Sequence, residues 1–121
     1  MVKEKLVDHI HALDVVDIRT FDYPEYSKIW VVSVNNRMFA RSWGKSKTSW
    51  YWAFKQNGIG IMRIDNSEYK IRAFVPQDID SLHDKINSAY QERYGSGEAA
   101  MVAKAMQSRS RWEMTLEFEV I

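Results

Sequence analysis

A run of alternating apolar residues, Lys28 to Val34, constrains the fold of this chain more than any other segment. It reads KIWVVSV, and its β-branched and aromatic residues fit a pleated strand. One face of that strand would carry Trp30, Val32 and Val34, and the other Ile29 and Val31. A strand that is apolar on both faces has to be covered on both sides. We therefore expect Lys28 to Val34 to be one central strand of the sheet.

The residues after this strand predict a tight hairpin. Asn35 and Asn36 follow directly, and asparagine tolerates the left-handed backbone that a two-residue hairpin turn requires. Met38 to Ser42 should then return antiparallel. In that register Met38 and Ala40 share one face, while Phe39 and Arg41 share the other.

Periodicity and turn residues predict the remaining elements. We expect an amphipathic first helix on Val2, Leu6, Ile10 and Leu13, an edge strand at Asp17 to Phe21, and a short helix from Trp50 to Asn57. Strands at Ile59 to Ile64 and Glu68 to Val75, helices at Asp78 to Tyr94 and Glu98 to Gln107, a polar break at Ser108 to Ser110 and a closing strand from Trp112 follow. Six largely hairpin-connected strands with inserted and flanking helices favour an α+β fold whose antiparallel sheet closes into a barrel.

Length and composition limit the classes of function. A chain of 121 residues fits one domain, residues 1–121, with one core. The absence of cysteine excludes disulfides, thiolate metal sites and a cysteine nucleophile, and it fits the cytoplasm. No stretch resembles a signal peptide or a membrane span, so we expect a cytoplasmic protein with no membrane partner.

Basic and aromatic residues gather in one segment. From Tyr26 to Ile64 there is no acidic residue. The basic residues there are Lys28, Arg37, Arg41, Lys45, Lys47, Lys55 and Arg63, and Trp30, Trp43, Trp50 and Trp52 are interleaved with them. The net charge of only +1 means that any attraction for an anion is local. Such a segment suits a flat anionic ligand.

The same segment carries a family resemblance. The run from Ile29 to Ile64, the later INSAYQERYG and the closing TLEFEV resemble the uncharacterised bacterial family called domain of unknown function 2255. That family is similar in turn to deazaflavin-dependent nitroreductases and FMN-binding split barrels, and the matching positions here are Ser42, Gly44, Trp50 and Tyr51. The resemblance implies a split β-barrel, a cofactor (FMN or a deazaflavin) along Arg41, Ser42 and Trp43, an oxidoreductase of unknown substrate, and a homodimer.

The chemistry of these residues agrees with such a cofactor. A flavin phosphate needs positive charge and several donors, which Arg41, Ser42, Lys45, Lys47, Thr48 and the amides at the helix start would supply. The flat ring would stack on Trp43, Trp50 or Tyr51. Hydride chemistry belongs to the cofactor, so no catalytic residue is expected from the chain.

Two other readings stay open. The nitroreductases carry a basic phosphate loop where this chain has FDYPEYSK, so a cofactor-free domain that binds a small ligand or a protein partner is the first alternative. Single-stranded nucleic-acid binding is a distant third, because acidic residues follow the basic segment closely. No metal site is expected, since His9 and His11 point to opposite sides of a helix and His83 stands alone. Trp30, Phe54, Ile86 and Tyr90 are expected to pack in the core.

Overall fold

A computed structural model describes residues 15–43 and 49–121. Its strands are β1 (Val16–Thr20), β2 (Ser27–Ile29), β3 (Val32–Val34), β4 (Arg37–Arg41), β5 (Ile59–Ile64), β6 (Ser67–Phe74) and β7 (Thr115–Val120). Its helices are α2 (Trp50–Gln56), α3 (Ile79–Tyr94), α4 (Ala100–Met106) and α5 (Arg109–Trp112), with a 3-10 turn η1 (Gly97–Ala99) before α4. The predicted helix on Val2, Leu6, Ile10 and Leu13 lies outside the described residues.

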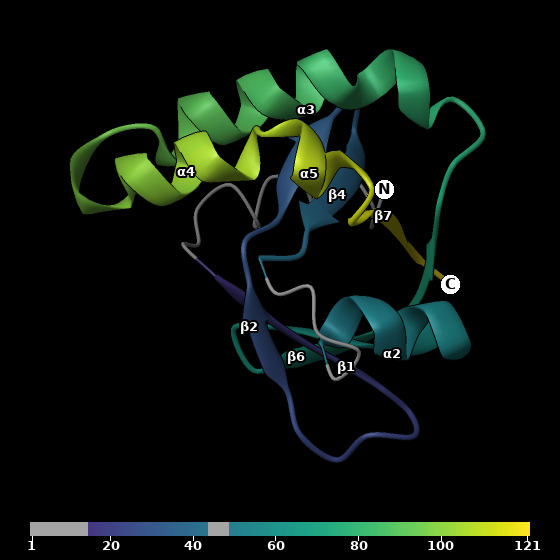
Figure 1. Ribbon diagram of the computed structural model, residues 1–121. Helices are drawn as coiled ribbons and strands as arrows, with labels where there is room; N and C mark the ends of the chain where they lie inside the picture. Colours follow the sequence, from purple (N-terminus) through teal and green to yellow (C-terminus); the bar gives the residue numbers. More distant parts are fainter. Residues whose placement is uncertain (1–14, 44–48) are drawn as a thin grey trace.

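The strands form one antiparallel sheet that curls into a half-barrel. Their order is β2-β1-β5-β6-β7-β4-β3, so the two outermost strands are neighbours in the chain. Only Trp30 and Val31 separate them, and three Cα steps span at most about 11 Å. The two edges of the sheet must therefore lie close together, which forces the sheet to curl. Figure 1 shows α3, α4 and α5 packed on one side of this sheet and α2 at the opposite end, beside β1 and β6.

The segment from Lys28 to Val34 corrects our prediction of one central strand. The alternation itself is confirmed, because Ile29 and Val31 point into one apolar cluster and Val32 and Val34 into the other. The position is wrong, since the segment is divided into β2 and β3, which are the two edges. A bend at Trp30 and Val31 makes this division, and it raises the strand count from six to seven. Curling covers an edge strand on both faces, as a central position would.

Two hairpin turns have a left-handed backbone, and at the first of them the two asparagines predicted it. Asn35 and Asn36 have φ angles of 55° and 61° and join β3 to β4. Asp65 and Asn66, with φ angles of 56° and 81°, join β5 to β6 in the same way. Both central residues of each turn have positive φ, the geometry that matches the twist of antiparallel strands.

The curled sheet separates two apolar cores. The first lies inside the half-barrel beneath α2 and includes Ile18, Met38, Phe54, Met62 and Phe118. The second lies between the outer face of β3 and β4 and the helices α3 and α4, and it includes Phe39, Ile86 and Tyr90. The predicted packing of Phe54, Ile86 and Tyr90 in the core is confirmed. Trp30 is only half-buried and stacks on Tyr94, with ring centroids 3.9 Å apart.

Strand β1 also differs from the prediction of an edge strand. It pairs with β2 on one side and with β5 on the other. A close approach at Gly60 makes this arrangement fit, because a Cβ there would lie 2.2 Å from the Arg19 carbonyl oxygen and 2.8 Å from the Phe54 ring. Glycine is therefore needed where β5 passes between β1 and α2.

The end of the chain contains a helix that we predicted as a break. Helical structure does stop after α4, at Gln107 and Ser108, but Arg109 and Ser110 already belong to α5, which also carries Trp112. The predicted closing strand starts only at Thr115. Trp112 stacks on His83 of α3, so its ring belongs to the helical layer rather than to the sheet. None of the helices in the described part of the chain is long and apolar enough to cross a membrane.

Candidate functional site

Arg41, the first predicted cofactor residue, is buried behind β4. Its side chain is only 1% exposed. Nε donates to Thr115 Oγ1 at 3.1 Å, Nη1 to Met106 O at 3.0 Å and to Asn87 Oδ1, and Nη2 to His83 O at 3.3 Å. Nη2 also lies 3.1 Å from His83 Nδ1. A guanidinium has five N–H groups, so every one of them has an acceptor within the protein.

No carboxylate contacts this buried guanidinium in the described part of the chain. Its other neighbours are the rings of Tyr90 and Trp112, whose centroids lie 5.8 and 5.9 Å from Cζ. Burial lowers the pKa of Arg41 to about 10. The residue stays protonated near neutral pH and places a positive charge inside the layer between the sheet and its helices.

An aromatic groove lies on the other side of the same arginine and unites three of the predicted residues. Its volume is about 180 Å³. The residues that line it are Val15, Lys28, Ile29, Trp30, Arg41, Trp43, Trp50, Val102 and Met106. Trp43 is 52% exposed, and the Arg111 guanidinium lies 5.0 Å from its ring centroid. Three tryptophans and two cations thus meet at one surface hollow.

The remaining predicted residues fall into three groups. Ser42 is fully buried, and its amide donates to Met114 O at 3.0 Å. Tyr51 does not line the groove: it points into the half-barrel, its hydroxyl donates to Glu113 O at 2.9 Å, and burial raises its pKa. The predicted contacts from Gly44, Lys45, Lys47 and Thr48 lie outside the described residues.

Three side chains near Arg41 were missed in the sequence. From the sequence we treated His83 as isolated, placed Arg109 in a predicted break and gave Arg111 no role. In the structure, His83 and Arg109 lie against the Trp112 ring, and Arg111 lies against the Trp43 ring. Nε and Nη1 of Arg111 are buried and have no hydrogen-bond partner among residues 15–43 and 49–121. The pattern SRSRW, with arginines at alternate positions before a tryptophan, was the available signal.

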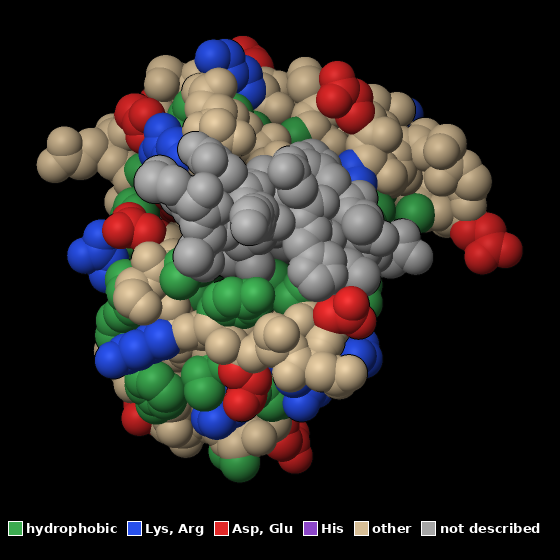
Figure 2. Space-filling model, turned by 180° about the vertical axis from the view of Figure 1, so that it is seen from behind, with side chains coloured by type: hydrophobic (Ala, Val, Ile, Leu, Met, Phe, Trp, Pro, Cys, Tyr) green, Lys and Arg blue, Asp and Glu red, His purple; other side chains and the backbone are tan. Residues whose placement is uncertain are grey.

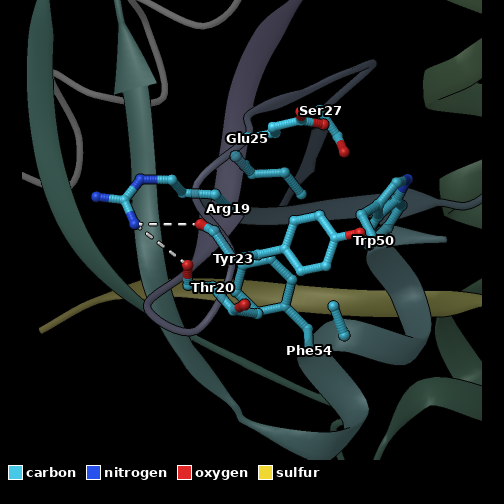
Figure 3. Close-up of a pocket in the computed structure, with 9 residues that line it drawn as sticks. Arg19, Thr20, Tyr23, Glu25, Ser27, Trp50 and Phe54 are labelled. Carbon is cyan, nitrogen blue, oxygen red and sulfur yellow. Dashed lines mark hydrogen bonds between the residues drawn. The ribbon is translucent and has the colours of Figure 1, made fainter. Parts of the chain in front are cut away.

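A small hollow lies on the far side of Trp50, under the loop from β1 to β2. Its volume is only about 30 Å³, roughly one water molecule's share of liquid volume. Figure 3 shows Tyr23, Trp50 and Phe54 around it, while the Arg19 guanidinium turns away to bond the backbone carbonyls of Thr20 and Tyr23, both at 3.3 Å. This hollow is too small for a cofactor. Of the two hollows that Trp50 lines, only the aromatic groove could therefore hold part of one.

A cleft larger than either of these hollows lies between the start of α3, α5 and β7. Its volume is about 540 Å³. It is lined by Val75, Ile79, Asp80, His83, Arg109, Trp112, Glu113 and Thr115. No sequence prediction pointed to this cleft. The described residues contain no cluster of histidine and acidic side chains that would hold a metal ion.

Two solved structures resemble the chain along its whole length. A putative pyridoxamine 5′-phosphate oxidase from Listeria innocua is 11% identical, with a TM-score of 0.59 over 100% of this chain and 93% of that chain. A conserved hypothetical protein from Mycobacterium tuberculosis is 10% identical, with a TM-score of 0.58 over 100% of this chain and 80% of that chain. At this identity the likeness shows the fold alone, the split barrel of pyridoxamine 5′-phosphate oxidase-like proteins.

Sequence comparison places the chain more specifically. No curated protein matches it. A family model described as an uncharacterized protein conserved in bacteria (DUF2255) matches residues 6–118, nearly the whole chain. The resemblance found in the sequence is thereby confirmed, and this split-barrel chain belongs to the DUF2255 family of uncharacterised bacterial proteins.

Proposed function

We propose that this protein binds a flat aromatic cofactor of the flavin or deazaflavin type in the groove of Trp30, Trp43 and Trp50. The observation that carries the proposal is the meeting of these three rings with Lys28 and Arg41 at one hollow. A flat ring gains by stacking on exposed aromatic side chains, and an anionic tail gains from nearby positive charge. The resemblance to FMN-binding split barrels supports the same ligand.

Each residue has a distinct part in this proposal. The exposed ring of Trp43 offers a stacking face, and Trp30 and Trp50 form the apolar walls. Arg41 acts as a fixed positive charge below the groove, because its N–H groups already have protein acceptors. The buried N–H groups of Arg111, beside Trp43, would bond an anionic oxygen that reached them. Phosphate contacts by Lys45, Lys47 and Thr48 stay a prediction.

The bound cofactor would supply hydride chemistry, and the chain would supply its binding and orientation. The hollow of about 180 Å³ is below the range of about 300–1,000 Å³ that is typical of ligand pockets. It therefore accommodates part of such a ligand, with the remainder along the surface. The proposal also includes an oxidoreductase role, with an unknown substrate, and a homodimer. Only the family resemblance supports these two parts.

A titration of the purified protein with FMN and, in parallel, with a deazaflavin tests the proposal. We expect saturable fluorescence changes with a Kd in the micromolar range or tighter, or a yellow protein as isolated. Trp43→Ala should weaken binding about fivefold to a hundredfold, since stacking on one ring is worth about 1–3 kcal/mol. Phe21→Ala is the matched control. Phe21 is 48% exposed, a fraction similar to the 52% of Trp43, and it does not line the groove. Absence of binding near millimolar cofactor would contradict the proposal.

Nucleic-acid binding has less support from the described surface. Lys28 and Arg63 bond the same carboxylate, Asp17, at 3.1 and 2.9 Å, and Arg72 bonds Glu119 at 3.2 Å. On the face shown in Figure 2, basic and acidic side chains are interspersed rather than gathered by sign. A steep decrease in oligonucleotide affinity with increasing salt concentration would be needed to support nucleic-acid binding.

A further inference from the structure

The large cleft between α3, α5 and β7 has a floor that is held in one geometry. His83 is 6% exposed, and its ring stacks on Trp112 with centroids 4.5 Å apart and planes 13° apart. The Trp112 indole N–H donates to Gln107 O at 3.1 Å, which fixes the second ring. The floor is therefore a preformed surface of two stacked rings, and ordered side chains of this kind lower the entropic cost of binding a ligand.

The neighbour of His83 determines which of its ring nitrogens carries the proton. Arg41 Nη2 lies 3.1 Å from Nδ1, and a guanidinium can only donate. Nδ1 must accept this bond, so the neutral ring carries its proton on Nε2. Nε2 has no hydrogen-bond partner in the described part of the chain, and His83 lines the cleft. Nε2 is therefore the ring nitrogen that is left to donate to a ligand in the cleft.

Two arginines lie near this donor. Buried Arg41 lies directly behind His83, and no carboxylate contacts it among the described residues. Arg109 lies at the rim, with its guanidinium 4.8 Å from the Trp112 ring centroid. Burial, followed by the charge of Arg41, lowers the pKa of His83, so the ring stays neutral near pH 7. A buried cation without a counter-charge favours an anion nearby.

The rim narrows the choice of anion. Asp80 and Glu113 are exposed and line the same cleft, where they would repel a doubly charged phosphate more than a single carboxylate. Val75 and Ile79 add apolar surface to the wall. A ligand with one negative charge and an apolar body matches all of these groups.

We propose that this cleft is a binding site for a small monocarboxylate with an apolar body. The carboxylate accepts hydrogen bonds from His83 Nε2 and from Arg109, and the apolar body lies against Val75, Ile79 and Trp112. The site is separate from the tryptophan groove, since no described residue lines both.

Benzoate is the probe for this proposal, with benzamide as its neutral isostere and inorganic phosphate as the dianion. Each is titrated into ¹⁵N-labelled full-length protein while the histidine ring and tryptophan indole resonances are followed by NMR. We expect His83 in the Nε2–H form, and saturable shifts of His83 and Trp112 by benzoate, with affinity at least tenfold higher than for benzamide or phosphate. Equal shifts by benzoate and benzamide, or no saturation by benzoate, would overturn the proposal.

Variants at the exposed rim test the assignment without disturbing the core. Arg109→Gln should weaken benzoate binding about tenfold or more, as expected for a charged hydrogen bond. Arg72→Gln is the matched control, since Arg72 is also exposed and lies outside the cleft. Glu113→Gln should strengthen binding, because it removes a repelling charge. Unchanged affinity in Arg109→Gln, or weaker binding in Glu113→Gln, would contradict the assigned contacts.

Discussion

The two ends of strand β4 place the same residue type in opposite environments. Arg37 and Arg41 lie four residues apart, on the face that packs toward the helices. Arg37 is partly exposed and bonds two carboxylates, Asp78 at 2.8 and 2.9 Å and Glu117 at 2.7 and 3.1 Å. Arg41 is buried and has only neutral acceptors within the described chain.

The difference shows that surroundings, not residue type, set the behaviour of a charge. The two carboxylates raise the pKa of Arg37, whereas burial lowers the pKa of Arg41 to about 10. The first arginine ties the start of α3 to β4 and β7. The second leaves a positive charge between two surface hollows. An anionic ligand bound there, rather than an acidic side chain, can compensate this charge.

The largest expected effect is at the buried end. Arg41→Met should lower the free energy of unfolding by more than about 3 kcal/mol, because it leaves the buried acceptors on Asn87, Thr115 and His83 without donors. Urea denaturation measures this change. Arg37→Met is the control at the other end of the strand, and an equal loss in both variants would mean that burial does not distinguish them.

A second variant tests the wall of the Arg41 site. Tyr90 is fully buried, and its hydroxyl accepts the Arg41 backbone N–H at 2.8 Å. Tyr90→Phe should cost about 1–2 kcal/mol, because it leaves that amide unpaired in the core. The matched control is Tyr26→Phe, which removes a hydroxyl that bonds exposed Glu68. If both variants were equally stable, the buried hydrogen bond would be unimportant.

The effect of salt on the free energy of unfolding should differ between variants of the two arginines. Arg37→Gln is expected to cost roughly 1 kcal/mol at low ionic strength, and less in 1 M salt, because a partly exposed ion pair is screened. Arg41→Gln should show a loss that hardly changes with salt, since its partners are neutral and buried. The free energy of unfolding at 0.05 and 1 M sodium chloride measures both. A larger salt effect on Arg41→Gln would reverse the comparison.

The smallest expected effect is the contribution of His83 to the pH dependence of the free energy of unfolding. Burial and the charge of Arg41 lower the pKa of His83 from 6.5. Below about pH 6.5 the unfolded chain therefore takes up a proton that the folded chain excludes, so stability falls as pH falls. His83→Gln should lose stability less steeply between pH 7.5 and 5.5. Desolvation raises the pKa values of Asp17 and Asp78, but hydrogen bonds from their arginine partners outweigh it and lower both values from 3.8. These two carboxylates therefore affect stability only at lower pH.

His9 and His11 are present in both proteins of this comparison, so their contribution to the slope cancels. Urea denaturation at each pH gives the two slopes. Equal slopes for the parent and His83→Gln would mean that His83 takes up its proton in the folded state as readily as in the unfolded state.

Local sequence determined most of the elements and their faces. Alternation assigned each apolar residue of Lys28 to Val34 to the correct core, and Asn35-Asn36 specified its turn through the backbone that asparagine tolerates. These properties depend on residues next to one another in the chain. The family resemblance, carried by the same residues, identified the split barrel.

The tertiary structure alone decided where those elements meet. Nothing local to Trp30 and Val31 distinguishes a bend between two sheet edges from a continuous central strand, because both positions cover both faces. The burial of Arg41, the proton position on His83 and the stacking of Trp112 each depend on contacts between residues more than 25 positions apart in the chain. Periodicity reports which face a side chain takes, whereas charge and proton position depend on the distant groups that the fold brings to it.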